Sequence, residues 1–497
     1  NYDNVAAMAE GVIVGGLDNM RYATGVQTAS ETQSESGNLS YAGRVNYNYG
    51  NKYLLEIAAR YDASTNFAPE YRWGFFPSVS AGWVISDEPF FKNNITAVDF
   101  LKLRGSLGFM GGDATKAYNW LTSYSIQTGK GAVFGGNADR PLIVSPNNAM
   151  ANRNARWDNN TKYNFGIDAQ FLKNRLSLSL DAFYDHRYNM LTALTSSVPL
   201  LVGATLPSEN FASVDGFGYE FSLGWTDKIT NDWSYRINTF LTWNDNKQLK
   251  VDVDKGKIGT YEDPIGQSTD MGVQGYSYLG MFRTQQEVES FIAKNPNYTI
   301  FGAAPKPGML YYEDIRGPKD ASGQFTAPDG KITDADQKFL TKKANNHYGI
   351  GFNVSTTYKN LSISAVMGAS FGGQSVIESA ARSQATLTAN RPQFWADHWT
   401  PENTAAAYPS PYYRDNYNVV SEFWFANSLS LGMRNFNISY GLPAKLAKSV
   451  GLSSLKVYLV SVNPFNFYNP YSYKTYSGSY DAYPTLRSFS LGLNVGL

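Results

Sequence analysis

The last ten residues of the chain alternate without interruption between apolar and small polar side chains. The apolar positions are Phe489, Leu491, Leu493, Val495 and Leu497. Because side chains of a β-strand alternate between its two faces, this segment carries an apolar stripe on one face only. The same pattern recurs along the whole chain. Hydrophobic residues make up 43% of it, an ordinary share for a soluble protein, so no surplus of apolar residues is left to build a core of that size. A wall with lipid on one side and water on the other satisfies both facts, so the sequence predicts an all-β fold, a transmembrane antiparallel β-barrel.

Composition supports this prediction and excludes other classes. Tyrosine (35), phenylalanine (29) and tryptophan (10) make the chain 15% aromatic, and membrane barrels use aromatic girdles at both interfaces. The absence of cysteine excludes a disulfide scaffold, thiol catalysis and cysteine-ligated zinc. Lys plus Arg and Asp plus Glu both number 42, so net charge gives no argument for nucleic acid or for an anionic membrane surface as a partner.

Two kinds of segment are missing from the sequence. No run of 18 apolar residues occurs, which argues against membrane-spanning helices. No signal peptide precedes the first polar residues. An outer-membrane barrel needs such a peptide, so we expect the chain to be the interior and end of a longer polypeptide.

Alternating segments predict about 14 strands. They lie near 40–50, 52–62, 75–86, 100–111, 118–127, 161–172, 175–190, 215–227, 232–246, 274–283, 346–358, 360–371, 426–440 and, in two passes, 454–497. Short turns at Lys173-Asn174 and Lys359-Asn360 predict hairpins. Long connections alternate with these turns, and residues 284–294 within one of them predict a short helix. A soluble propeller or sandwich is disfavoured because so many strands alternate along their whole length.

Ordered landmarks along the chain resemble the SusC/RagA-type TonB-dependent transporters of Bacteroidetes. The landmarks are Trp73–Trp83 (WGFFPSVSAGW), Asp87–Lys92, Leu101–Ser106, Arg156–Asp158, Asn164–Asp168, Asn174–Ser179, Gly218–Phe221, Gly280–Arg283, Phe394–Asn403 (FWADHWTPEN) and Tyr483–Asn494. They cover nearly the whole chain in the order of the family. The family's plug domain, its TonB box and its first barrel strands have no counterpart, and Leu497 stands where Phe is commoner.

The resemblance implies a function and partners. A barrel of this family resembles one of 22 strands with a plugged lumen, of which residues 1–497 would form the C-terminal part. It implies a multi-pass protein of the outer membrane that imports a bulky nutrient, with an oligosaccharide favoured, energised by the TonB complex through the missing N-terminal part. A SusD-like lipoprotein would cover it outside. An importer of oligopeptides and a passive porin or structural barrel are the alternatives. No catalytic set is found, so an enzyme is not expected.

The two longest connections, 284–344 and 372–424, are expected to be extracellular and to meet the lipoprotein. Interfaces of that kind use aromatic anchors. The second connection offers Phe394, Trp395, Trp399, Tyr408, Tyr412 and Tyr413. Because loop packing is the commoner role of such aromatics, the substrate contacts stay unassigned.

One segment resembles a calcium loop. With Gly330 as its tight-turn glycine, Asp329 and Asp336 fall at acidic positions five and twelve, and Lys331 offers its carbonyl at position seven. Positions one and three lack side-chain oxygens, and Asp314 could complete the set across an insertion. The prediction is a structural calcium ion held by Asp314, Asp329, Lys331 and Asp336; the alternative is a turn held by Asx hydrogen bonds.

The three histidines, His186, His347 and His398, are too scattered in sequence to form a ligand set.

The alternation also assigns faces. The predicted lipid-facing positions are Phe165, Ile167, Leu178, Leu180, Ile350, Phe352, Leu361, Ile363, Leu491 and Leu493. The predicted lumen-facing positions are Gly166, Asp168, Ser179, Ser362, Ser364, Ser490 and Asn494. A register slip of one residue would exchange the two sets, which contact with lipid forbids.

Overall fold

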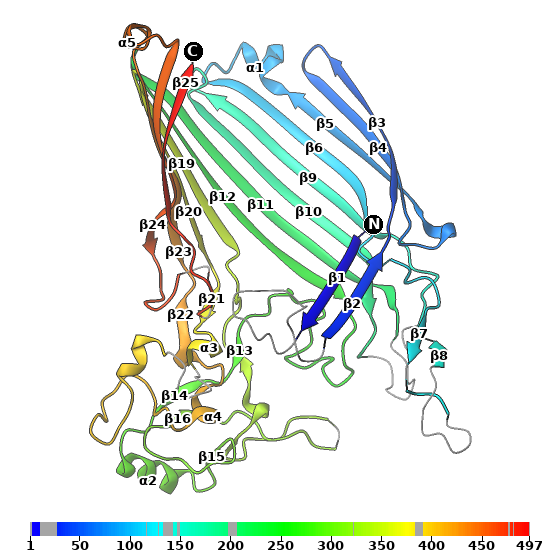
Figure 1. Cartoon of the computed structure of the whole chain (residues 1–497), viewed down its shortest axis with the longest axis vertical. Helices are drawn as coiled ribbons and strands as arrows, with labels where there is room; N and C mark the ends of the chain where they lie inside the picture. Colours follow the sequence, from blue (N-terminus) through cyan, green and yellow to red (C-terminus); the bar gives the residue numbers. More distant parts are fainter. Residues whose placement is uncertain are drawn as a thin grey trace.

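A large antiparallel sheet dominates the computed structural model (Figure 1). The structure describes residues 2–9, 27–115, 117–127, 129–132, 143–146, 150–196, 206–321, 323–382, 391–475, 478–480 and 482–496, so Leu497 lies outside the described residues. Thirteen strands form the sheet, in the order β25-β24-β23-β20-β19-β12-β11-β10-β9-β6-β5-β4-β3. Their bounds are β3 Asn38–Tyr49, β4 Tyr53–Ser64, β5 Trp73–Val84, β6 Val98–Gly112, β9 Asp158–Phe171, β10 Leu176–Ala193, β11 Ser208–Thr230, β12 Trp233–Lys250, β19 Tyr348–Tyr358, β20 Leu361–Phe371, β23 Ser430–Gly441, β24 Ser454–Tyr468 and β25 Ser488–Gly496.

The two ends of this sheet, which we call the wall, differ sharply. At the turn end the connections are short or carry one small helix, α1 (Pro89–Lys92) or α5 (Ala444–Ser449). The predicted turn between β9 and β10 has left-handed backbone at Lys173 and Asn174, with φ of 60° and 61°. At the loop end the connections are long, and residues 251–347 and 372–429 run far beyond the strands (Figure 1).

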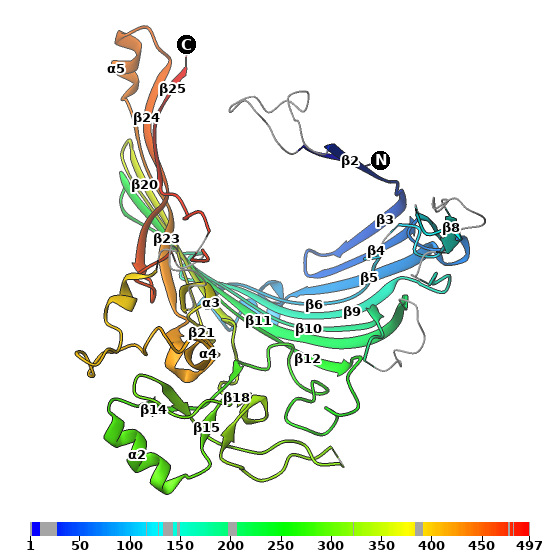
Figure 2. The ribbon, with the colours of Figure 1, turned by 60° about the horizontal axis from the view of Figure 1, so that its bottom comes forward.

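The wall remains open among the described residues. β3 pairs only with β4, and β25 pairs only with β24. The first described strands, β1 (Tyr2–Ala9) and β2 (Gln27–Ser34), form a separate two-stranded ribbon. The C-terminal strand is therefore not paired with a strand near residue 40, as expected for a barrel that needs further strands to close. Figure 2 shows the wall as a curved trough with both edges free.

Two predicted strands are wrong. Residues 118–127 contribute only β7 (Tyr124–Gln127), which pairs with β8 (Ile143–Pro146) outside the wall. Residues 274–283 divide into β13 (Gln274–Gly275) and β14 (Tyr278–Met281), which also lie outside it. The second segment mimics a wall strand because its aromatic residues alternate, but Tyr276, Met281 and Phe282 are buried in a core.

Cross-strand register separates an apolar face of the wall from a polar one. Leu180 lies opposite Ile167 on β9 and Phe221 on β11, and Leu491 lies opposite Leu459, which lies opposite Ile438. Paired residues of an antiparallel sheet share a face, so the predicted lipid-facing set falls on one face and the predicted lumen-facing set on the other. Leu491 is 78% exposed, as a side chain meant for lipid should be.

Aromatic side chains form two belts on the apolar face. The belt at the loop end contains Tyr163, Tyr184, Phe217, Tyr219, Trp243, Tyr348 and Phe371, with ring centroids 5.5 Å apart for Tyr219–Trp243 and 5.1 Å apart for Tyr348–Phe371. The belt at the turn end contains Tyr49, Tyr53, Trp83, Trp225, Trp233, Tyr235 and Tyr358. On β12, Trp233 and Trp243 are separated by about 33 Å of strand. At a tilt of about 40–45° this corresponds to the roughly 25 Å apolar band of an outer-membrane barrel.

The polar face is held together by ionic contacts across strands. The Arg104 guanidinium on β6 donates to Asp168 on β9 at 3.0 Å and to Asp181 on β10 at 2.5–2.6 Å. Glycines let aromatic rings lie flat on the same face, as where Phe240 covers Gly351 so closely that no Cβ would fit. This face is polar and smooth, as the water-filled side of a barrel requires.

A folded outer domain stands at the loop end (Figure 2). It is built from the described parts of residues 273–340 and 374–427, which contain β13, β14, β15 (Thr299–Ile300), β16 (Leu310–Tyr312), β17 (Lys331–Ile332), β18 (Lys338–Phe339), β21 (Gln374–Val376), β22 (Phe425–Asn427) and helices α2 (Gln285–Lys294), α3 (Ser379–Arg382) and α4 (Arg414–Tyr417). The predicted helix at 284–294 is confirmed as α2, capped by the Thr284 side chain, which accepts from the Glu287 N–H. None of the helices among the described residues has the length and apolarity to span a bilayer.

One aromatic core joins both connections of the outer domain. Its buried members are Tyr276, Met281, Phe282, Val288, Tyr298, Ile300, Met309, Leu310, Tyr312, Ile332, Trp395, Tyr417 and Trp424. Asn416 links the two segments: its side chain accepts from the Leu310 N–H and donates to the Leu310 carbonyl, both at 2.8 Å. Burial raises the pKa of the Tyr276, Tyr298 and Tyr312 hydroxyls, so these groups are structural hydrogen-bonding groups. The two predicted loops are therefore one structural unit.

Candidate functional site

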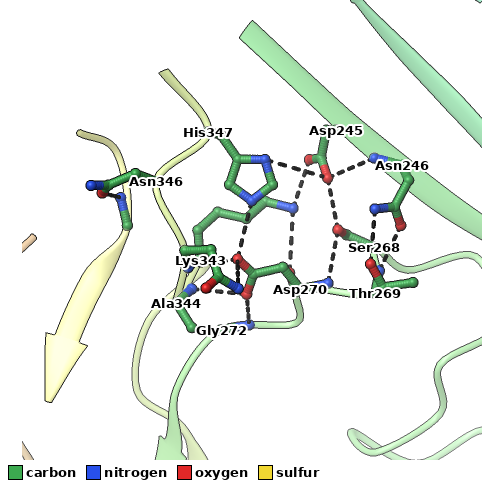
Figure 3. Close-up of polar contacts among 12 residues, drawn as sticks. Asp245, Asn246, Ser268, Thr269, Asp270, Gly272, Lys343, Ala344, Asn346 and His347 are labelled. Atoms are coloured by element: carbon green, nitrogen blue, oxygen red, sulfur yellow. Dashed lines mark hydrogen bonds and ion pairs between the residues drawn. The ribbon is translucent and has the colours of Figure 1, made fainter. Parts of the chain in front are cut away.

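A polar cluster fixes the outer domain to the rim of the wall (Figure 3). We call it the neck cluster: Asp245 five residues before the end of β12, Ser268 and Asp270 in the outgoing chain, and Lys343 and His347 in the returning chain. The Lys343 ammonium lies 2.6 Å from Asp245, and the Ser268 hydroxyl donates to the same carboxylate at 2.7 Å. The Asp245 carboxylate of the wall thus contacts both the outgoing and the returning segment of the connection.

Asp270 is the centre of the neck cluster. Its oxygens accept from the backbone N–H groups of Ala344 at 2.8 Å, Asn345 at 2.7 Å and Gly272 at 3.1 Å. Burial opposes its charge, but these bonds and the contact with His347 outweigh burial and lower the pKa of Asp270 to about 2. Asp270 therefore joins the outgoing and returning chains as a carboxylate.

His347 completes the neck cluster from the returning chain. Its Nδ1 is 2.6 Å from the Asn244 carbonyl oxygen, and its Nε2 is 3.1 Å from Asp270. His347 thus lies between the wall at Asn244 and the outgoing chain at Asp270. No pattern in the sequence indicates this role, because the three histidines are scattered and the partners of His347 lie far from it along the chain.

A cavity of about 650 Å³ opens beside the neck cluster, and we call it the rim pocket. Side chains from the wall, from residues 261–271 and from residues 339–343 line it. Its lining includes the aromatic residues Phe217, Tyr261 and Phe339 and the lysines Lys247 and Lys342. Tyr261 packs edge-on against Phe339, with ring centroids 6.1 Å apart, and the Arg316 guanidinium lies 4.1 Å from the Tyr261 ring centroid. The pocket is therefore lined by both aromatic and basic side chains.

The residues predicted to bind calcium come together, but mainly through the backbone. Asp336 is fully buried and accepts from the N–H groups of Ile315 and Thr333, both at 2.8 Å. Asp314 accepts from the Gly330 N–H at 2.6 Å, and Asp329 from the Lys331 N–H at 2.9 Å. Of these contacts, only that of Asp329 with the N–H two residues on has the form of an Asx turn.

The acids near Asp314 still affect one another. Burial, followed by the proximity of Asp336 and Asp329, raises the pKa of Asp314. Among the described residues, no group of three or more acidic, histidine or cysteine side chains is arranged to hold a metal ion. Calcium requires 6–8 oxygens, and the side chains present do not supply that set in this arrangement. Calcium binding here stays a prediction.

The expected aromatic anchors in 372–424 are mostly not available to a partner. Trp395 is buried, and Phe394, Trp399, Tyr408 and Tyr413 pack against the core of the outer domain. Only Tyr412 of the six is freely presented, at 92% exposed. Because the outer domain needs a core of its own, these aromatics serve that core. Tyr412 is the remaining candidate anchor.

The geometry defines a class of protein: an antiparallel membrane wall with aromatic belts, a polar inner face and a large folded domain at one end. The family model described as "TonB dependent receptor-like, beta-barrel" matches residues 12–304. The chain therefore belongs to that family of outer-membrane β-barrels, and the apolar face of its wall meets lipid. Its relatives are receptors and not enzymes.

Individual relatives agree with this assignment. The chain is 26% identical over 490 residues to the TonB-dependent receptor P3 of Formosa agariphila, covering 93% of this chain and 46% of that receptor. It is 29% identical over 293 residues to the TonB-dependent receptor SusC of Bacteroides thetaiotaomicron, covering 55% of this chain and 28% of that receptor. The chain thus spans about half the length, or less, of the curated relatives it matches.

Solved structures show the same fold. The structure of the RagAB peptide transporter superposes with a TM-score of 0.71 at 18% identity, covering 97% of this chain and 49% of that chain. A second structure of RagAB, described as the open-open state, gives a TM-score of 0.73 at 18% identity over 96% of this chain and 48% of that chain. At this identity the likeness concerns the fold alone.

Proposed function

We propose that the chain forms the wall and the outer domain of an active importer for a bulky nutrient, energised through TonB. The observation that carries this proposal is a lipid-facing wall with a polar inner face, lying beneath a folded domain with a core of its own. A passive porin needs only the wall, and loops as large as these are usually functional. Kinship with the SusC receptor supports the same class.

The loop end is the extracellular end in this proposal, because outer-membrane barrels carry short periplasmic turns and longer external loops. The outer domain is then the surface on which a SusD-like lipoprotein rests. Tyr412 supports that role, since it is a large aromatic side chain left in solvent on a domain that buries its other aromatics. Replacing Tyr412 by Ala in the complete protein should weaken capture of the lipoprotein by roughly 1–2 kcal/mol or more. Unchanged capture would remove Tyr412 from the interface.

An oligosaccharide is the cargo we propose, and an oligopeptide is the alternative. The peptide alternative has one supporting observation, that the RagAB structures with the same fold are described as those of a peptide transporter. Uptake distinguishes the two in cells that carry the complete gene or a deletion of it. Loss of growth on oligosaccharides with peptide use intact supports the proposal, and the reverse loss supports the alternative. Uptake that persists without TonB identifies a passive pore.

A further inference from the structure

The rim pocket lies just above the aromatic belt, on the face of the wall that meets lipid. β12 alternates without a bulge from Trp243 to Lys247, since each residue keeps its partner on β11 in sequence. Asp245 and Lys247 therefore point to the same side as Trp243. Lys247 lies about 13 Å further along the strand than Trp243, or about 9 Å along the membrane normal at the usual tilt.

That height lies at the outer edge of the headgroup layer of a membrane. Aromatic belts mark the boundary of the hydrocarbon core. The polar layer beyond it is about 5–8 Å thick on each side, from a core of about 30 Å within about 40–45 Å. A charged side chain placed one or two rungs above Trp243 and facing outward meets lipid headgroups before it meets bulk water.

The acids around the pocket are already engaged, and two of its lysines are free. Asp245 is held by Lys343 and Asp270 by backbone N–H groups. Asp215, the cross-strand neighbour of Lys247, pairs with His186 at 2.6 Å. Across the described parts of the chain, neither Lys247 nor Lys342 has an ion-pair partner, and both are exposed. Lys247 and Lys342 therefore offer the pocket two ammonium groups that no carboxylate of the described residues pairs with.

We propose that the rim pocket binds the phosphorylated headgroup of an anionic lipid in the leaflet at the loop end, with Lys247 and Lys342 contacting phosphate. Lysine is a common phosphate ligand, and a basic residue near a membrane surface contributes about 1 kcal/mol to anionic-lipid binding. Phe217 and the Tyr261–Phe339 pair offer aromatic surface against which the carbon skeleton beside the phosphate packs. The volume of about 650 Å³ suits a headgroup unit.

The site also has a structural consequence. Lys247 belongs to the wall, whereas Lys342 belongs to the chain returning from the outer domain. A phosphate held by both would bridge the same two parts that the neck cluster joins, and would brace the outer domain against the membrane surface. The leaflet is the outer one in the orientation of the proposed function, but binding itself does not depend on that orientation or on the cargo.

The test uses the complete protein, purified in uncharged detergent and titrated with lipid A that carries its phosphates or has had them removed. The double variant Lys247→Gln/Lys342→Gln should lose roughly 10–30-fold in affinity for phosphorylated lipid A. The matched control Lys294→Gln/Lys306→Gln removes two exposed lysines of the outer domain distant from the pocket and should bind as the parent does. Lys247→Arg should retain binding, and Lys342→Glu, which changes no wall residue, should lose it even if the double variant fails to fold.

Three results would overturn the proposal. Equal affinity for the phosphorylated and dephosphorylated lipid would show that the rim pocket does not recognise phosphate. Full competition by inorganic phosphate alone at low millimolar concentration would assign the lysines to free phosphate. Displacement of the lipid by a soluble sulfated or uronate-bearing oligosaccharide at lower concentration would assign the pocket to the nutrient. None of these results bears on whether the protein is an importer, which the growth experiment decides separately.

Discussion

The wall and the outer domain use the same residue types in opposite ways. In the wall, aromatic and aliphatic side chains point outward and stay exposed, as Leu491 and Phe165 do. In the outer domain, the corresponding side chains point inward, and Trp424 and Tyr312 are fully buried. The difference follows from the solvent that each region meets. Contact with lipid stabilises an apolar exterior, whereas contact with water favours burial of apolar side chains in a core. The wall and the outer domain of one chain are therefore stabilised by different solvents. A single substitution should change the stability of one of the two regions and leave the other unchanged.

The largest effect is expected from Trp424→Ala in the outer domain. Trp424 is fully buried, and its indole N–H donates to the Tyr417 carbonyl at 2.6 Å. Its removal should cost the outer domain about 3–5 kcal/mol. Hydrogen exchange should show faster exchange at Leu310 and Tyr312 and unchanged protection in β10 and β11. Tyr412→Ala, an exposed aromatic truncation, is the control. Loss of protection in both regions after Trp424→Ala would refute the separation.

The next effect concerns the lipid face of the wall. Leu491→Arg should reduce assembly into membranes by about 2–4 kcal/mol if Leu491 lies near the midplane. Ser490→Arg adds the same charge one position away on the polar face and should assemble almost normally. The folded fraction recovered from membranes measures both variants. Equal loss in the two variants would contradict the assignment of faces.

A smaller effect is expected at the junction of the two regions. Asp270→Asn weakens the charge-assisted bonds of the neck cluster and should loosen the outer domain by about 1.5–3 kcal/mol. Because the pKa of Asp270 is lowered to about 2, its contribution is present above the unfolded value of about 3.9 and is lost as the pH falls from about 4 towards 2. Protease sensitivity of residues 251–267 should rise over that range in the parent protein. A parent protein that resists protease equally at both pH values would remove Asp270 from this role.

The smallest effect tests the calcium prediction. The raised pKa of Asp314 means that the fold favours its protonated form, so stability falls as the pH rises through that pKa. Asp314→Asn should therefore stabilise the outer domain slightly at neutral pH if no cation binds. If calcium binds, the parent should lose stability on chelation, and Asp314→Asn should be destabilising and insensitive to chelator. Thermal unfolding with and without chelator separates the two cases.

Sequence reasoning succeeded where a local rule governs the structure. The thirteen wall strands and their faces follow from a period of two that lipid enforces where the strands cross it, as in residues 176–187 of β10. It failed where residues far apart must meet. Asn416 and Leu310 are 106 positions apart, and Asp270 and His347 are 77 apart, so no pattern in the sequence joins them. The alternating residues 274–283 misled for the same reason, because β13 pairs with β18, β14 pairs with β16, and the Tyr276 N–H donates to the distant Val420 carbonyl.

The most direct test of the two-solvent account uses the absence of cysteine, since single cysteines can be introduced without background. Spin labels placed at each residue from Leu176 to Tyr184 on β10 report collisions with lipid-soluble oxygen and with a water-soluble nickel complex. The account predicts strict alternation, with oxygen preferred at Leu178, Leu180 and Ala182 and nickel preferred at Ser179 and Asp181. Uniform accessibility along the strand, or alternation of the opposite phase, would contradict it.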